Sequence, residues 1–199
     1  MQHTSSGRRV LAAIAVATLV TLAVETPARA ESRQIDAEHS TLTVFVYKSG
    51  LFSALADNHV IAAPVAGGSV SDEAPLAVEV SVRSADLKVL DPDTSASRRA
   101  EVQARMQGAD VLDVATYPEI TFSSTSIDAM GTNRWNVTGR LTIHGQTRTI
   151  TVATVLEGGR YRGSVLVKQR EFGIRPISIA GGVVKVKDEL KIQFDVAVR

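Results

Sequence analysis

Apolar and polar positions alternate with a period of two along most of the chain after residue 40. In the first such run, Leu42, Val44 and Val46 alternate with polar or aromatic neighbours, and similar runs cover residues 76–83, 135–143 and 192–198. This period is typical of β-strands that bury one face and leave the other in contact with water. The pattern therefore predicts a sheet protein with one apolar face.

The connections between these runs are short. His144-Gly145-Gln146 separates two of them and Gly158-Gly159 the next two, and glycine supplies the positive φ that tight antiparallel hairpins require. Residues 94–108 differ, because alanines and a methionine lie among arginines and glutamate without strand-forming residues, and Gly108 is a plausible helix stop. We expect an all-β domain with one short helix.

About eight strands in one domain either close as a barrel or stack as a sandwich, and periodicity alone leaves both arrangements open. Closure removes exposed strand edges and leaves an interior wide enough for side chains or one small ligand. We predict a closed antiparallel β-barrel of about eight strands, in which the last strand, residues 190–198, pairs with the first, residues 42–47. The residues expected to line its lumen lie on the apolar sides of the runs and are Val44, Val46, Val78, Val80, Phe122, Trp135, Val137, Leu141, Val165, Val167, Ile192 and Phe194.

The N-terminus has the three zones of a secretory signal. Arg8 and Arg9 precede an apolar stretch over residues 10–24, and Ala28-Arg29-Ala30 forms a small-x-small cleavage site. We predict a signal peptide over residues 1–30, a mature domain over residues 31–199, and a periplasmic or secreted location. A membrane anchor is the alternative, but no later stretch has the roughly 18 apolar residues of a spanning helix. The choice between Sec and twin-arginine export stays open.

Composition narrows the range of partners. Loss of the leader removes three arginines and one glutamate and changes the formal net charge from +1 to −1. A near-neutral chain with interspersed charges offers no footprint for nucleic acid and no polybasic patch for a membrane. The chain has no cysteine, which excludes disulfides, thiolate metal sites and cysteine nucleophiles. The sequence leaves a homodimer open.

The sequence has few candidate catalytic or metal-binding residues. The mature histidines, His39, His59 and His144, lack the spacing that places two metal ligands on one helix face, and the chain has no Gly-x-Ser-x-Gly elbow for a serine nucleophile. Asp57-Asn58-His59 is the only tight polar cluster in an apolar setting. It is either a metal or acid/base site or, as we favour, a set of local turn hydrogen bonds. For His144, before Gly145, we favour a turn role. We expect no enzymatic activity, no metal and no cofactor.

Four segments, in order, carry a resemblance to a known family: Ile35-Asp36 with His39-Ser40, Tyr117-Pro118-Glu119-Ile120-Thr121-Phe122, Gly139-Arg140-Leu141-Thr142-Ile143-His144-Gly145, and Arg170-Glu171-Phe172-Gly173-Ile174. From about Ile35 to Val198 the chain resembles the YceI-like lipid- or polyisoprenoid-binding proteins. The resemblance implies a lipocalin-like extended barrel whose apolar lumen holds a long-chain isoprenoid or similar lipid. The chain departs from the family pattern at residues 51–60 and 98–101, where a loop or helix borders the lumen entrance, so Phe52, Asp57 and His59 are entrance candidates.

Together these features predict an exported, non-catalytic protein that binds an amphiphilic lipid. Burial of each methylene group contributes about 0.8 kcal/mol before ordering costs, so a partly enclosed prenyl tail supplies enough free energy for binding. The alternative is a structural or interaction module of the cell envelope whose lumen its own side chains fill. Inward Val, Leu and Phe side chains serve both interpretations, and the sequence does not separate them.

Overall fold

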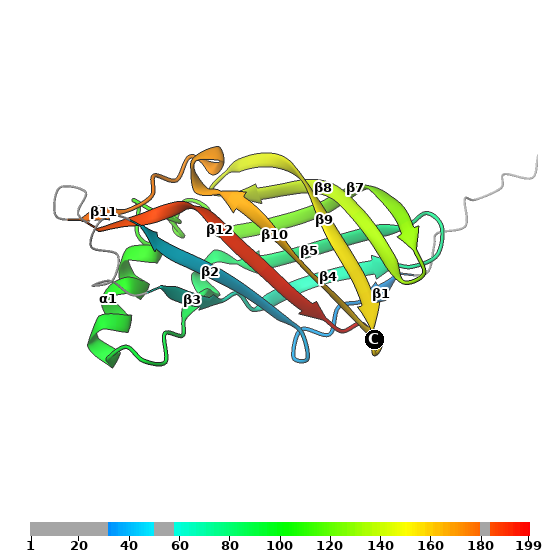
Figure 1. Ribbon diagram of the computed structural model, residues 1–199, viewed down its shortest axis with the longest axis horizontal. Coiled ribbons are helices and arrows are strands. Elements are labelled where there is room, and N and C mark those ends of the chain that lie inside the picture. Colours follow the sequence, from blue (N-terminus) through cyan, green and yellow to red (C-terminus); the bar gives the residue numbers. More distant parts are fainter. Residues whose placement is uncertain (1–31, 50–57, 180–183) are drawn as a thin grey trace, which may run out of the picture.

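The computed structural model describes residues 32–49, 58–179 and 184–199, and it consists of β-strands with one α-helix (Figure 1). The α-helix is α1 (Ala96–Gln107), and two short 3-10 helices are η2 (Ser84–Asp86) and η3 (Gln169–Phe172). The strands are β1 (Arg33–Gln34), β2 (Thr41–Ser49), β3 (His59–Ala62), β4 (Val65–Ser71), β5 (Ala77–Arg83), β6 (Lys88–Val89), β7 (Glu119–Gly131), β8 (Arg134–Ile143), β9 (Gln146–Glu157), β10 (Arg160–Lys168), β11 (Ser178–Ile179) and β12 (Val184–Val196).

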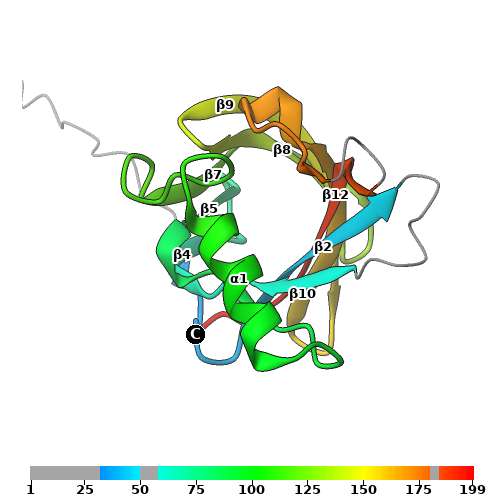
Figure 2. The ribbon, with the colours of Figure 1, turned by 90° about the vertical axis from the view of Figure 1, so that its left-hand side faces the viewer.

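The strands form one antiparallel sheet that curls strongly on itself (Figure 2). Its order is β1-β4-β5-β7-β8-β9-β10-β12-β2-β3-β6, and β11 pairs with β12 off this path. The prediction of a mostly-β antiparallel fold with one helix is confirmed. The sheet has twelve strands in the described residues where about eight were expected: β1 and β11 are additional two-residue strands, Ala63-Pro64 separates β3 from β4, and η2 with Leu87 separates β5 from β6. Proline has no N–H to donate and so interrupts a strand ladder. The path has two ends, β1 and β6, and a closed eight-stranded barrel is not confirmed.

The pairing of the last long strand with the first is confirmed. Leu190 of β12 lies opposite Val46 of β2, and Phe194 lies opposite Leu42. At the far end of β12, an isolated bridge joins Val198 to Ile35, directly after β1. Segments from the two ends of the described chain therefore lie side by side.

Both predicted hairpins are present. His144 and Gly145 have φ values of 50° and 69° between β8 and β9, and Gly158 and Gly159 have values of 57° and 75° between β9 and β10. Positive φ at both central residues is the conformation that matches the twist of paired strands. The predicted turn role of His144 is thus confirmed, and its Nδ1 also lies 3.3 Å from the carbonyl oxygen of Phe172.

The predicted helix is also confirmed, and it lies across one end of the curled sheet (Figure 2). The Ser95 hydroxyl caps its N-terminus by accepting a hydrogen bond from the backbone N–H of Arg98. From the middle of α1, the Gln103 amide donates to the carbonyl of Leu87 at 2.7 Å and accepts from the N–H of Val89 at 2.8 Å. Its side chain therefore takes the place of a neighbouring strand along β6, which ends the sheet path.

Replacement of Gln103 by leucine tests this role. The substitution keeps an apolar stem but leaves the backbone groups of Leu87 and Val89 without their partners, at an expected cost of about 1 to 3 kcal/mol in the free energy of unfolding. Urea denaturation measures the loss. Gln107→Leu is the matched control, because Gln107 makes one exposed hydrogen bond to Ala85. Equal, small effects from both variants would contradict the role of Gln103.

Candidate functional site: an apolar cavity inside the sheet

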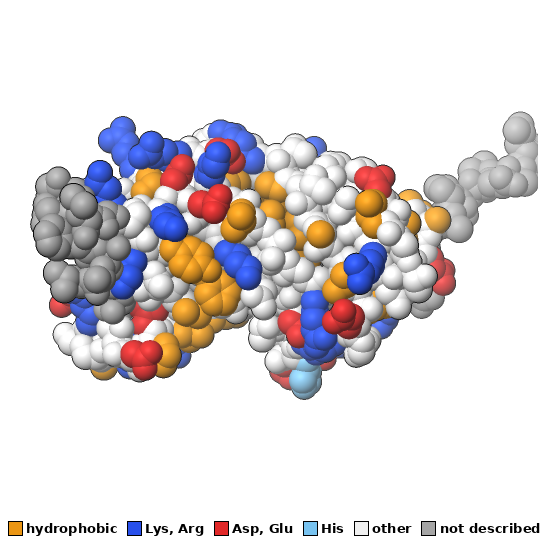
Figure 3. All heavy atoms as spheres, in the orientation of Figure 1, with side chains coloured by type: hydrophobic (Ala, Val, Ile, Leu, Met, Phe, Trp, Pro, Cys, Tyr) orange, Lys and Arg blue, Asp and Glu red, His pale blue; other side chains and the backbone are white. Residues whose placement is uncertain are grey.

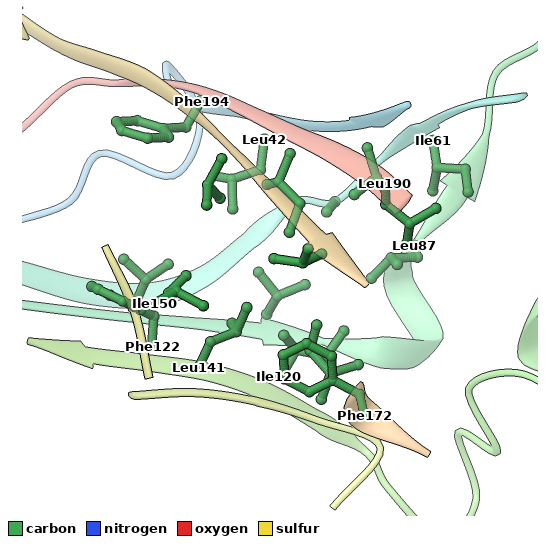
Figure 4. A pocket seen from close by; sticks show the side chains of 18 of the residues that line it. Leu42, Ile61, Leu87, Ile120, Phe122, Leu141, Ile150, Phe172, Leu190 and Phe194 are labelled. Carbon is green, nitrogen blue, oxygen red and sulfur yellow. The ribbon is translucent and has the colours of Figure 1, made fainter. Parts of the chain in front are cut away.

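The concave side of the sheet encloses a cavity of about 590 Å³. All twelve side chains predicted to line a lumen line this cavity. Figure 4 shows two facing walls, with Leu42, Leu190 and Phe194 on one side and Phe122, Leu141 and Ile150 on the other. The side chains meet across the cavity because the period-two alternation places every apolar position on the concave face. A cavity of this size falls within the range of small-molecule sites, about 300 to 1,000 Å³.

Two glycines, in strands β8 and β10 beside the cavity, make room for phenylalanine rings. A Cβ atom at Gly139 would lie 2.5 Å from the Phe122 ring, and one at Gly163 would lie 2.6 Å from the Phe194 ring. Each ring therefore packs closely over the bare backbone of the strand beside its own. Rings in this position leave the centre of the cavity free. Larger residues at positions 139 and 163 would displace the rings inward.

Polar groups lie on the cavity lining at both ends. Arg98, Glu101 and Arg105 project from α1, while Lys48 and Lys185 line the same end from β2 and β12. Ser71, Asp72 and Tyr161 line the cavity elsewhere, and Tyr161 lies near Trp135, with 6.2 Å between the ring centroids. Burial raises the pKa of Tyr161, and the Asp72 carboxylate raises it further. Most of the other lining residues are apolar.

His59 is the one entrance candidate within the described residues, and it lines the cavity. Its Nδ1 lies 2.7 Å from Oδ2 of Asp91, while Oδ1 of Asp91 accepts a hydrogen bond from the N–H of Val60. The side chain of Asp91 is only 2% exposed. Phe52 and Asp57 lie outside the described residues. The partner of His59 is therefore Asp91, which is distant in sequence.

Of the Asp57-Asn58-His59 cluster, the structure describes Asn58 and His59, and Asn58 links two neighbouring strands. Oδ1 of Asn58 accepts a hydrogen bond from the N–H of Lys48 at 3.2 Å, across the ends of β3 and β2. Within residues 32–49, 58–179 and 184–199, no three histidine or acidic side chains gather in a way that would hold a metal ion. His39 lies elsewhere, beside Asp36 at 2.9 Å.

The sequence placed residues 98–101 at the lumen entrance but gave no cavity-facing residue of α1 as a candidate. Arg98, Glu101, Val102, Arg105 and Met106 all line the cavity. Their spacing of three and four residues places them on one helix face, and that signal is present in the sequence. No pattern in the sequence around Asp91 predicts its contact with His59, because that contact depends on the pairing of β3 with β6.

No helix in the described part of the chain has the length and apolar character needed to cross a membrane. The predicted signal peptide and its cleavage site lie outside the described residues. The signal peptide and the exported location stay predictions.

A single antiparallel sheet curled around an apolar cavity places the chain in the class of β-proteins with an internal cavity. Residues 34–198 match the YceI-like domain family, and the chain belongs to that family. The resemblance drawn from the four sequence segments is thereby confirmed.

Curated relatives match over shorter segments. A UPF0312 protein of Pseudomonas savastanoi is 35% identical over 89 residues, which cover 40% of this chain and 46% of the relative. A UPF0312 protein of Vibrio parahaemolyticus is 31% identical over 112 residues, which cover 53% of this chain and 59% of the relative. The chain thus spans about half the length of the curated relatives that it matches.

Solved structures share the fold. Burkholderia cenocepacia BcnA is 22% identical with a TM-score of 0.58, covering 81% of this chain and 98% of that one. A polyisoprenoid-binding domain from Saccharophagus degradans, implicated in plant cell wall breakdown, is 15% identical with a TM-score of 0.55, covering 82% and 95%.

A Gly163→Ala substitution tests the packing that keeps the cavity open. The added Cβ would lie 2.4 Å from the carbonyl oxygen of Ala153 as well as against the Phe194 ring, so strand and ring must both shift. We expect a loss of about 1 to 3 kcal/mol in the free energy of unfolding, measured in urea. Gly67→Ala is the control, since its Cβ would meet only the Ser81 hydroxyl at 3.4 Å. A Gly163→Ala variant as stable as the parent would contradict this packing.

Proposed function

We propose that this protein is an exported, non-catalytic carrier that holds one amphiphilic lipid, with an isoprenoid-type chain, inside the cavity. The observation that carries the proposal is the cavity of about 590 Å³, whose walls are apolar side chains from most strands of the sheet. A solid structural core would fill this space, because protein interiors pack to the density of organic crystals. The open volume favours a carrier over the structural module.

The chemistry of the walls sets the class of ligand. Valine, leucine, isoleucine and phenylalanine side chains offer no hydrogen bonds, so the bound part of a ligand is a hydrocarbon. At about 0.8 kcal/mol per buried methylene, a tail of some ten carbons contributes about 8 kcal/mol before ordering costs, which is on the scale of micromolar binding, and a longer tail offsets those costs. The Saccharophagus degradans domain with the same fold is named for polyisoprenoid binding, and this supports an isoprenoid chain.

Closure of the sheet around the ligand forms part of the proposal. Only Ala63-Pro64 separates β3 from β4, and η2 with Leu87 separates β5 from β6. If each pair acts as one bent strand and the two-residue strands β1 and β11 are set aside, eight strands remain, and each is hydrogen-bonded to two neighbours once the β2–β3, β3–β6, β4–β5 and β5–β7 pairings are counted. Such a ring has no open edge next to the ligand.

Export to the periplasm or outside the cell rests on the charged, apolar and Ala-x-Ala zones before residue 31. Carriage requires no catalytic group, metal or cofactor, because the hydrophobic effect alone drives binding. The partner is a lipid, and neither nucleic acid nor a membrane anchor enters the proposal.

Filling the cavity tests the proposal. Val80 and Val165 line the cavity, and a tryptophan at either position would occupy the volume of the ligand. In a roomy cavity the ring is accommodated, so we expect retained lipid to fall while the urea midpoint stays nearly unchanged. The paired measurements are lipid per protein, from native mass spectrometry and organic extraction, and the urea midpoint of each variant.

Thr43→Trp is the control, because Thr43 stands on the same strand as Val44 but does not line the cavity. This variant should keep its lipid. Overpacking a filled core costs about 1 to 3 kcal/mol. A large fall in the urea midpoint of both inward variants, with no lipid in the parent protein, would show a solid core and contradict the carrier proposal.

A further inference from the structure

At the end opposite α1, the cavity ends on a second cluster of buried side chains. This cluster, which we call the cavity floor, consists of Ile35, Val65, Val70 and Val196, each 5 to 7% exposed. The strand that directly precedes Ile35, β1, lies at the opposite end of the molecule from α1 (Figure 1). We infer that the cavity floor sets the greatest length of isoprenoid tail that the cavity buries. The inference rests on the proposed function and adds a limit on the size of the ligand.

Three of the four floor residues contact the cavity. Ile35, Val70 and Val196 line it, whereas Val65 does not. The three lining residues come from separate segments of the chain, which are the residue after β1, strand β4 and strand β12. A bridge between Ile35 and Val198 joins the first of these segments to the end of the last. The floor therefore spans the cavity end between both ends of the described chain.

Ile35 is held in place by β4. Its backbone N–H donates to the carbonyl oxygen of Gly68 at 3.0 Å. A Cβ atom at Gly68 would lie 2.8 Å from Cδ1 of Ile35, so the bare backbone of this glycine makes room for the isoleucine side chain. The side chain is thus packed closely against β4, and a ligand tail does not displace it without breaking this packing.

Polar contacts on the outside hold the same segment. The N–H of Asp36 donates to the carbonyl oxygen of Ala197 at 2.9 Å, and the Asp36 carboxylate lies 2.9 Å from Nδ1 of His39. The Arg160 guanidinium donates to the backbone carbonyl of His39. Figure 3 shows basic, acidic and histidine side chains together at the lower right, on the end that β1 and the C-terminus occupy in Figure 1. The tail of a ligand therefore meets a fixed wall.

The lining becomes polar beside the floor. In β4, Val70 is followed by Ser71 and then, directly after the strand, by Asp72, and all three residues line the cavity. Asp72 forms an ion pair with Arg33 at 3.0 Å. A hydrocarbon that covered this pair would remove water from its charges, which is unfavourable. The apolar part of the lining thus ends at the floor.

This arrangement makes binding depend on tail length in two stages. Each isoprene unit that enters the cavity buries more hydrocarbon, so binding tightens as the tail lengthens. Once the tail end contacts the floor, a further unit stays in water or has to fold back into occupied space, and the affinity stops rising. The cavity therefore selects tails up to this limit and gains nothing from longer polyprenols.

Polyprenols that differ only in tail length test the inference. Their lengths run from two isoprene units, as in geraniol, through farnesol and geranylgeraniol to eight units, and native mass spectrometry of competing pairs gives the relative affinities. We expect the affinity to rise about tenfold or more with each unit and then to reach a limit within the series. Ile35→Ala removes part of the floor and should move the limit to a longer tail, whereas Val70→Phe should move it to a shorter one.

Val65→Ala is the matched control, because Val65 is buried in the same cluster but does not line the cavity. It should lower the urea midpoint as Ile35→Ala does and keep the limit of the parent. Each limit compares ligands on one variant, so a loss of stability does not shift it. Affinity that rises through the whole series in the parent, or one limit shared by the parent, Ile35→Ala and Val70→Phe, would overturn this role of the floor and leave the carrier function standing. No binding of any polyprenol would contradict both.

Discussion

Every feature of the site depends on one geometric constraint, the two-residue period of the β-strand. In a sheet that curls, this period sends alternate side chains to the concave face, and in this chain those positions are apolar on strand after strand. The apolar faces meet around a shared interior and do not need a second sheet or a layer of helices to cover them. Whether that interior becomes a solid core or a binding site then depends on the volume of the inward residues.

The volume of the cavity depends on glycines at two inward positions. The inward positions 139 and 163 carry no side chain, and the phenylalanines of neighbouring strands pack over them. Aromatic rings have a large apolar surface. When the rings lie against the wall, that surface faces the cavity and can contact a ligand, whereas rings in the centre would contact one another. The same protein with larger residues at these positions would push its rings toward the centre and would lose cavity volume without a change in strand topology.

The helix links this cavity to the outside. Gln103 hydrogen-bonds the backbone of Leu87 and Val89, and Arg99 donates to the carbonyl oxygen of Asp91, so α1 stabilises the end of the sheet. Val102, Arg105 and Met106 of the same helix line the cavity. Asp91 in turn holds His59 at that end. A short stretch of chain thus combines a structural role with the polar part of the site.

Much of this was predictable from the sequence, and the reason is local. Alternation predicted long strands such as β2, β5, β8 and β12 and twelve residues that do line the cavity, and the glycines predicted two hairpins, because period and turn chemistry are encoded in neighbouring residues. The pairing of β12 with β2 followed from the need to cover an edge. The Asp91–His59 pair and the Gln103 bridge depend on contacts between segments distant in sequence, and no local pattern reports those. The short strands β3, β4 and β6 were not predicted, because Ala63-Pro64 and η2 interrupt the chain there and leave runs too short for the alternation to show clearly.

Trp135 offers the most direct measurement of the central claim, that the cavity holds a hydrocarbon chain. It is the only tryptophan in the protein, it lines the cavity, and it stands on β8 beside Tyr161 of β10, away from α1. A farnesol that carries bromine at its tail end quenches a tryptophan that it touches. We expect saturable quenching of Trp135 at one ligand per protein, relieved by unlabelled farnesol. Quenching that rises linearly without saturation, or no quenching at all, would contradict it.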